Sequence, residues 1–220
     1  MTKNKKLTIL HHYLISFLIM IGLTSLTTIT ILNLTRTYHI IIVQSNLEIV
    51  TEITHTRLMH NYRLLIQYLT TPWIQNLYLP DFPMSQIGII HFREVKNIFH
   101  TIQLIAILFI AYLLIKIQRK KQLLSYFNKA ANLTFALFGT LLTLIIINFE
   151  PTFLVFHAIF FRNDYWILHP ENDPIILALP HELFITKAIM ISTTLLTISI
   201  ITKILHHHQL SQSPRTSKKP

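Results

Sequence analysis

The stretch YLISFLIMIGLTSLTTITILNL, residues 13–34, contains no charged side chain. About 20 apolar residues in an α-helix cross the ~30 Å of hydrocarbon in a bilayer. A helix also satisfies its own backbone hydrogen bonds in lipid, so the stretch predicts a transmembrane helix. It is longer than the apolar core of a secretory signal peptide, and no small-residue cleavage pattern follows it. We therefore expect it to remain as a membrane anchor.

Three further apolar segments of similar length follow along the chain, at residues 97–117, 131–149 and 183–204. The whole sequence is 51% hydrophobic, with a mean hydropathy of +0.48. A soluble domain rarely concentrates its apolar residues in such uninterrupted runs. The sequence therefore predicts an all-α membrane protein with four transmembrane helices. We expect one domain over residues 1–205, followed by a basic cytoplasmic tail at 206–220.

The charged residues predict the orientation of these helices. All nine acidic residues fall within 35–96 and 150–182. The two ends of the chain and the link between the second and third segments carry basic residues and no acid: Lys3, Lys5, Lys6, Lys116, Arg119, Lys120, Lys121, Lys129, Lys203, Arg215, Lys218 and Lys219. Because cytoplasmic loops are enriched in Lys and Arg, we expect both termini in the cytoplasm and both long segments outside. The net charge of +10 then indicates topology and contact with anionic lipid, not nucleic-acid binding.

The sequence lacks the residues that several common kinds of functional site require. The chain has no Cys, which excludes disulfides, thiol nucleophiles and cysteine-bound metals. It has only 3 Gly, too few for a glycine-rich phosphate loop, and neither a GxSxG nor an HExxH motif. We expect no cofactor and no metal.

The first outer segment, residues 35–96, is too long to be structureless. Its apolar residues recur at helical spacing from 45 to 69, which predicts a helix at the membrane surface. Three prolines and three aromatic residues follow within 72–83, and such aromatics are typical of the headgroup level. We interpret this segment as an outer lid or collar.

The motif HFREVKN, residues 91–97, leads directly into the second apolar segment. His91 and Glu94 are three residues apart, so they share a helical face. His91 is either a functional group held on a rigid helix or an ordinary helix-end histidine beside a solvated carboxylate. The spacing alone leaves both readings open.

The second outer segment begins with a short helix at Pro151 and places His157 among phenylalanines. This histidine is either chemically active or packed among aromatics with its ring N–H bound to the backbone. Asn163, Asp164, Asn172 and Asp173 are typical of turns and caps. Lys187 lies about one turn inside the last segment, where it either extends toward the interface or faces a headgroup pocket.

These two blocks, HFREVKN and FHAIFFRNDYW…NDPIILALPHELF, together with four helices, resemble the lipoprotein intramolecular transacylase family of bacterial membrane proteins. The motif-level match covers residues 91–97 and 156–184, and the overall layout covers the whole chain. The family pattern has an aspartate three residues after the first histidine, where this chain has Glu94.

The resemblance implies an acyltransferase of the bacterial cell membrane, with its site at the extracytoplasmic face. Its substrate is a lipoprotein whose amino-terminal cysteine carries diacylglycerol. The sn-2 acyl chain moves to the cysteine α-amine and leaves a lyso-form lipoprotein. The family's two functional histidines match His91 and His157.

The chemistry of the residues is compatible with this reaction, because amine and ester belong to one molecule and no enzyme nucleophile is needed. A histidine is suited to remove the amine proton. We expect one histidine of the pair as base and the other as acid or orienting group. The expected supporting residues are Glu94, Arg93, Arg162 and Asp164. Those expected to bind acyl chains or headgroup are Phe153, Phe156, Phe160, Phe161, Trp166 and Lys187.

Two other classes of function remain open. One is a sensor or structural bundle without chemistry, which predicts that both histidines tolerate alanine. The other is a metal-dependent membrane hydrolase that uses the same histidines, which predicts loss of activity with a chelator.

Overall fold

A computed structural model describes residues 3–212 of the protein, and side chains within 9–119 and 122–212. The other side chains, among them basic residues used above for topology, lie outside this description: Lys3, Lys5, Lys6, Lys120, Lys121, Arg215, Lys218 and Lys219. Most of the expected basic tail, residues 213–220, also lies outside it.

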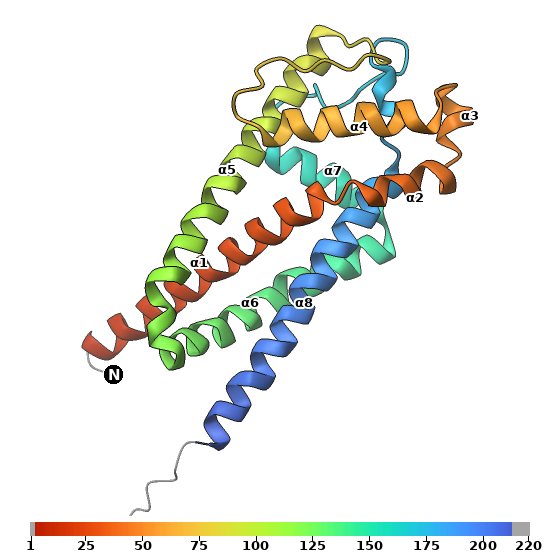
Figure 1. Cartoon of the computed structure of the whole chain (residues 1–220). Helices are drawn as coiled ribbons and strands as arrows, with labels where there is room; N and C mark the ends of the chain where they lie inside the picture. The colour runs from red at the N-terminus through yellow and green to blue at the C-terminus, as the bar shows by residue number, and fades with distance from the viewer. Residues whose placement is uncertain (1–2, 213–220) are drawn as a thin grey trace, which may run out of the picture. The chain divides into compact units, whose positions relative to one another are not determined.

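The described residues form helices and no strand. Four helices are long: α1 (Lys3–Asn33), α5 (Gln86–Lys116), α6 (Lys120–Ile147) and α8 (His181–Ser211) (Figure 1). By length and composition, each contains a segment that is able to cross a membrane. The prediction of four membrane helices is confirmed.

All four helices extend well beyond their predicted apolar cores. α5 begins at Gln86, before the predicted residue 97, and α8 continues to Ser211. Hydropathy detects only the apolar part of a helix, and the first three turns of α5 contain polar side chains that tertiary contacts bury, including His91 and Lys96. His91 therefore lies on a continuous helix, as the sequence predicts.

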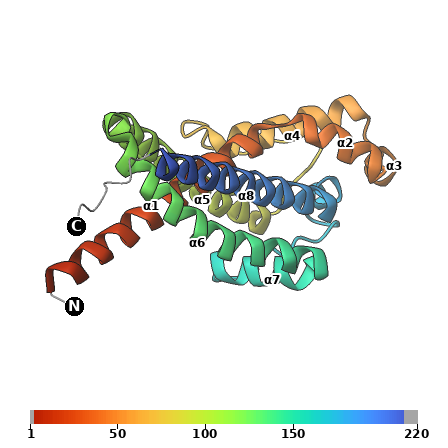
Figure 2. The same cartoon turned by 90° about the horizontal axis from the view of Figure 1, so that it is seen from below.

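The first connecting segment forms α2 (Arg36–Gln44), α3 (Leu47–Thr51) and α4 (His55–Thr70) in place of the single helix expected over 45–69. The breaks fall next to Asn46 and Glu52, whose φ angles are 49° and 56°. Asn adopts this left-handed conformation more readily than most residues, so the chain can turn there. Figures 1 and 2 both show α2, α3 and α4 grouped together, and α2 contacts both others.

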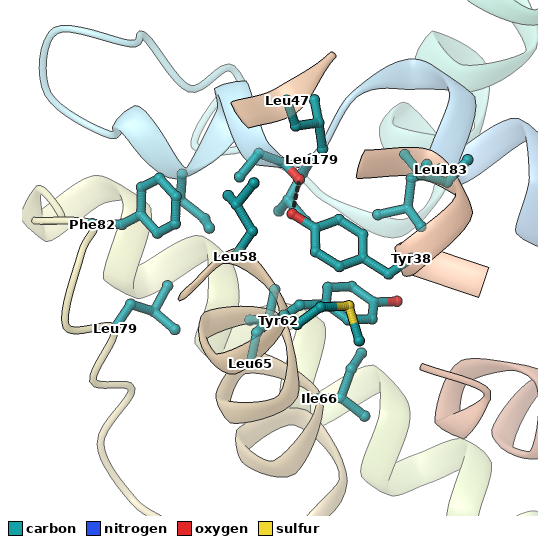
Figure 3. Close-up of a cluster of buried hydrophobic side chains, with 14 of the residues drawn as sticks. Tyr38, Leu47, Leu58, Tyr62, Leu65, Ile66, Leu79, Phe82, Leu179 and Leu183 are labelled. Carbon is teal, nitrogen blue, oxygen red and sulfur yellow. Dashed lines mark hydrogen bonds between the residues drawn. The ribbon is translucent and has the colours of Figure 1, made fainter. Parts of the chain in front are cut away.

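Buried residues of α2, α3 and α4 form an apolar core with the segment before α5 and the segment before α8 (Figure 3). Leu58 is fully buried at its centre, and the rings of Tyr38 and Tyr62 stack with centroids 4.0 Å apart. The Tyr38 hydroxyl donates a hydrogen bond of 2.8 Å to the carbonyl of Ala178, at the end of η2 (Pro174–Ala178). Burial raises the pKa of both tyrosines, so both hydroxyls stay protonated. The core thus fixes the two connecting segments to each other.

The contacts of the chain divide it into two compact units. Unit 1 comprises residues 1–27, 105–141 and 192–220, and unit 2 comprises 28–104 and 142–191. Unit 2 contains the core just described, the end of α1 and the starts of α5 and α8. Unit 1 contains a smaller apolar cluster around Ile19, Phe109 and Tyr126. The single domain over residues 1–205 stays a prediction.

Candidate active site

His91 and His157 lie next to each other within unit 2. His91 is on α5 and His157 is on the short helix α7 (Phe149–Phe160), and their ring centroids are 6.4 Å apart. Phe161 contacts both rings, with centroid distances of 5.0 Å to His91 and 5.5 Å to His157. Both histidines are largely buried, at 8% and 9% exposure. Two motifs that are far apart in sequence therefore meet in one site.

The backbone sets the tautomer of His157. Its Nδ1 lies 2.8 Å from the carbonyl oxygen of Phe153, one turn earlier on α7. A carbonyl only accepts, so Nδ1 carries the proton and Nε2 of the neutral ring keeps a lone pair. Burial lowers the pKa of His157, and this hydrogen bond opposes the shift only in part. A histidine that is merely packed among aromatics was expected to make this same bond to the backbone. The bond is equally compatible with catalysis, because it leaves Nε2 free to accept a proton.

His91 differs from His157 in its hydrogen bonding. Among the described residues, its buried Nδ1 has no hydrogen-bond partner. Buried polar atoms in folded proteins nearly always have a partner, so an exception indicates a place for a water, an ion or a bound molecule. The Nδ1 of His91 is therefore a group that a bound molecule could satisfy.

The aromatic residues named from the sequence divide into two sets. Phe153, Phe161 and Trp166 surround the His157 ring, with Phe153 and Trp166 centroids at 4.0 Å and 4.6 Å. Phe156 also contacts the His157 ring, with centroids 5.4 Å apart, and it pairs with Phe160 at 4.7 Å. Both of these side chains remain about half exposed on α7. The first set excludes water from the histidine, and the second offers an apolar surface.

Glu94 links the two motifs through Asn163. The Asn163 amide donates to Oε1 of Glu94 at 2.8 Å, and its own oxygen accepts from the backbone N–H of Tyr165. Among the described residues, Oε2 of Glu94 is buried without a hydrogen-bond partner. Asn163 therefore serves both as the predicted turn residue and as an anchor to α5, a role that the sequence did not reveal.

The other expected supporting groups are exposed side chains: Arg93, Arg162 and Asp164. Burial raises the pKa of Tyr68 on α4, and the positive charge of Arg93 lowers that pKa by a smaller amount. A step of two residues on a helix turns a side chain by about 200°, so Arg93 points away from the His91 face of α5. Arg162 directly follows Phe161 in the chain.

Lys187 bonds to the end of α1. Its ammonium donates to the carbonyls of Ile31 and Leu34 at 2.8 Å and 3.0 Å. The last carbonyls of a helix have no partner within the helix, and a cation there also suits the helix dipole. Lys187 thus caps α1 from α8.

Another lysine, Lys96, is buried and was not singled out from the sequence. It donates to the carbonyls of Thr71 and Ile74 and lies 4.4 Å from the ring centroid of Tyr68. It fixes the end of α4 against α5, the helix that carries His91.

Asp173 ties the start of α5 to the second connecting segment. Its carboxylate accepts hydrogen bonds from the Ser85 backbone N–H at 2.8 Å and from the Ser85 hydroxyl at 2.7 Å. The Ser85 hydroxyl in turn accepts from the N–H of Gly88, which makes Ser85 the N-cap of α5. Asp173 stands at the N-cap position of η2, as a cap residue would, but its side chain makes no cap bond there and binds Ser85, 88 residues away, which could not be read from the sequence.

No group of three or more His, Asp or Glu side chains that could hold a metal ion occurs within the described part of the chain. The residues that gather at the site are two histidines, one carboxylate and several aromatics. This set can move protons and exclude water.

Comparisons with known proteins identify the chain's relatives. A family model described as lipoprotein intramolecular transacylase Lit matches residues 12–184. A solved structure of the membrane-integral lipoprotein intramolecular transacylase Lit from Bacillus cereus is similar, with 31% identity and a TM-score of 0.85. The match covers 94% of this chain and 98% of that one.

Two variants of the same Bacillus cereus protein, in which one histidine is replaced by arginine or by alanine, also match. Each is 32% identical with a TM-score of 0.72, and each match covers 95% of this chain. The matches span 94% of the length of the arginine variant and 96% of the length of the alanine variant. No match was found among curated protein sequences.

The fold and these matches define a membrane-integral acyltransferase with four apolar helices. The chain belongs to the Lit family of lipoprotein intramolecular transacylases. The family resemblance seen in its two motifs is therefore confirmed.

Proposed function

We propose that this enzyme transfers the sn-2 acyl chain of a diacylglyceryl-cysteine to the α-amine of the same cysteine. The observation that carries the proposal is the pairing of His91 and His157, 6.4 Å apart, in a chain of the Lit family. The site lies in the connecting segments that the charge pattern predicts to be extracytoplasmic, where the lipid-modified end of a lipoprotein is found.

His157 is the proposed general base. An α-amine has a pKa of about 8 and attacks an ester only after it has lost a proton. Nε2 of His157 holds a lone pair, because Nδ1 is bound to the Phe153 carbonyl. The lowered pKa of His157 keeps the ring unprotonated at neutral pH. The nitrogen can then accept the amine proton as the C–N bond forms.

His91 is the proposed partner at the other side of the reacting carbonyl. Its unpartnered Nδ1 is suited to hold or protonate the glyceryl oxygen that leaves the acyl carbon. Glu94, on the same helix and anchored by Asn163, keeps the His91 segment in register with the segment after α7.

The reaction then balances without a water molecule or a cofactor. One C–O bond of the sn-2 ester breaks and one C–N bond of the amide forms. The amine proton ends on the glyceryl oxygen, relayed by the histidines. The amine and the ester belong to one molecule, and orienting such a pair is worth about 7–11 kcal/mol in favourable cases.

The aromatic side chains perform two tasks in this proposal. Phe153, Phe161 and Trp166 exclude water around the histidines, which protects the ester from hydrolysis. The exposed Phe156 and Phe160 contact the acyl chains of the substrate. Arg162 is the candidate donor for the oxyanion among the expected cations, because it directly follows the aromatic ring that contacts both histidines.

The test is alanine substitution of each histidine in a bacterium that accumulates diacylglyceryl lipoprotein. His91→Ala and His157→Ala are each expected to lower transfer by about 100-fold or more, the usual contribution of acid–base catalysis. His169→Ala, an exposed histidine of the same connecting segment, is the matched control and is expected to retain full transfer.

Insertion and the unfolding temperature of each variant separate lost chemistry from lost fold. Wild-type product from a folded double variant His91→Ala/His157→Ala would refute the proposed mechanism and favour a structural or sensor role. A product that has lost one acyl chain would instead indicate hydrolysis.

A further inference from the structure

A cavity of about 410 Å³ lies within unit 1, away in sequence from both site motifs. Its walls come from α1, from the end of α5, from the 3₁₀ turn η1 (Ile117–Arg119) and from the start of α6. The polar residues that line it include Lys116, Arg119, Gln122, Tyr112 and Tyr126. Nothing in the proposed transfer reaction uses this cavity.

Two cations stand close together in its wall. Lys116 is the last residue of α5 and Arg119 is three residues later, so both lie within one turn. The Tyr126 hydroxyl accepts a hydrogen bond of 3.0 Å from the Gln122 amide. The O–H of Tyr126 therefore remains able to donate. A pair of cations with a hydroxyl donor is suited to a phosphate oxygen.

The protein offers these cations no carboxylate within their own unit. The sequence of unit 1 contains twelve Lys and Arg residues and no Asp or Glu. All nine acidic residues of the chain belong to unit 2. Cations at the end of a membrane helix are stabilised by the anionic headgroups of the bilayer. The counter-charge for Lys116 and Arg119 must therefore come from outside the unit.

Apart from the imidazole of His11, the remaining lining of the cavity is apolar. Ile15 and Leu123 line it together with the tyrosine rings. Leu14, Leu114 and Ile115, neighbours in sequence of the lining residues, are more than half exposed on helices that are apolar enough to cross a membrane. A ligand with a phosphate at one end and hydrocarbon at the other satisfies both kinds of wall.

We infer that this cavity binds the phosphate of an anionic phospholipid, with Lys116 and Arg119 as its ionic contacts and Tyr126 as a hydroxyl donor. Free inorganic phosphate offers the same anionic group without the hydrocarbon. The apolar walls favour the lipid as the source. The inference does not rest on the proposed acyl transfer.

The test is native mass spectrometry of the full-length protein, released from membranes made of equal amounts of phosphatidylglycerol and phosphatidylcholine. The wild-type protein is expected to retain phosphatidylglycerol in preference to phosphatidylcholine. Each basic residue near an anionic surface contributes about fivefold to binding, so Lys116→Gln/Arg119→Gln is expected to weaken retention by about 30-fold.

Lys203→Gln is the matched control, because it removes a cation of the same unit whose ammonium binds Asn132 outside the cavity. It is expected to leave the lipid preference unchanged. If Lys203→Gln lost as much phosphatidylglycerol as the double variant, the binding would be general surface attraction, which would overturn the inference.

Two further experiments test the site, one with a charge-preserving variant and one with inorganic phosphate as a competitor. The charge-preserving variant Lys116→Arg/Arg119→Lys is expected to retain the lipid even if the neutral double variant fails to fold. Equal retention of both lipids by the wild-type protein would overturn the site outright. Displacement of phosphatidylglycerol by inorganic phosphate alone would show an anion site and refute the lipid assignment.

Discussion

The two units of the molecule differ sharply in how they satisfy their charges. Unit 2 has seven basic and nine acidic residues, and its polar side chains bind partners far away in sequence, as Asp173 does with Ser85. Unit 1 has twelve basic residues and no acid. Unit 2 is thus the part in which internal polar contacts position the two candidate histidines. Unit 1 is the part whose charges require an external partner.

Removal of the Asp173 carboxylate is expected to have the largest effect on the internal contacts of unit 2. Asp173→Ala loses two hydrogen bonds to a buried carboxylate and leaves the partly buried Ser85 donors without that acceptor, which costs about 3–5 kcal/mol of unfolding free energy. The start of α5, and with it His91, then loses its anchor. Thermal unfolding in detergent and the rate of acyl transfer both measure this.

The exposed Asp164 supplies the control for that change. Asp164→Ala is expected to shift unfolding by less than about 0.5 kcal/mol. Equal effects of the two substitutions would mean that the Asp173 contact does not stabilise unit 2.

A glycine-to-alanine pair compares a closely packed glycine of unit 2 with an open glycine of unit 1. A Cβ at Gly88 would meet the Asp173 carboxylate, which two hydrogen bonds hold in place, so Gly88→Ala is expected to destabilise by about 1–3 kcal/mol. A Cβ at Gly139, in unit 1, meets no atom within 4 Å. Gly139→Ala is expected to stabilise its helix by about 0.5–1 kcal/mol. Chemical or thermal unfolding of both variants gives the comparison, and a neutral Gly88→Ala would contradict it.

The pH dependence of transfer tests the state of His157. The rate is expected to fall tenfold per pH unit below the amine pKa of about 8, because only the free amine attacks. Burial lowers the pKa of His157 below its ordinary value of about 6.5, so the base is still unprotonated at pH 6.5 and protonates only further down. The slope of log rate against pH should therefore steepen from one to two below pH 6.5. Initial rates on a diacylglyceryl lipopeptide measure the slope. A steepening of the slope from one to two that begins above pH 7 would contradict the assignment.

The smallest expected effect compares two buried tyrosines. Tyr38→Phe in unit 2 removes a bond to the Ala178 carbonyl and is expected to cost about 1 kcal/mol or slightly more. Tyr126→Phe in unit 1 removes only an acceptor for the side chain of Gln122, one turn earlier on the same helix, and is expected to cost less. The unfolding temperatures of the two variants rank the contacts. A larger drop in unfolding temperature for Tyr126→Phe than for Tyr38→Phe would contradict the view that internal polar contacts matter more in unit 2.

The sequence predicted the features that depend on local composition and helical spacing. Four apolar runs were sufficient for the membrane helices, and the motif at His91 correctly predicted a helical histidine. The meeting of His91 with His157 followed from the family resemblance, since no local signal connects residues so far apart.

The sequence could not predict contacts between distant segments. The hydrogen bonds of Asp173 with Ser85 and of Asn163 with Glu94 join parts of the chain that only the folded core brings together. The breaks at Asn46 and Glu52 were also missed, because the apolar spacing continues across them. Lys187 looked like an interfacial cation, and its role as a cap became evident only from the position of the end of α1.

Mass spectrometry of a lipoprotein amino terminus tests the central claim most directly. The lipoprotein comes from a bacterium that accumulates the diacylglyceryl form, with and without this enzyme. Intramolecular transfer predicts an unchanged total mass, with fragment ions that place one acyl chain on the cysteine nitrogen and a free hydroxyl on the glycerol. Loss of the mass of one acyl chain, or an unaltered diacylglyceryl terminus in the presence of folded enzyme, would contradict it.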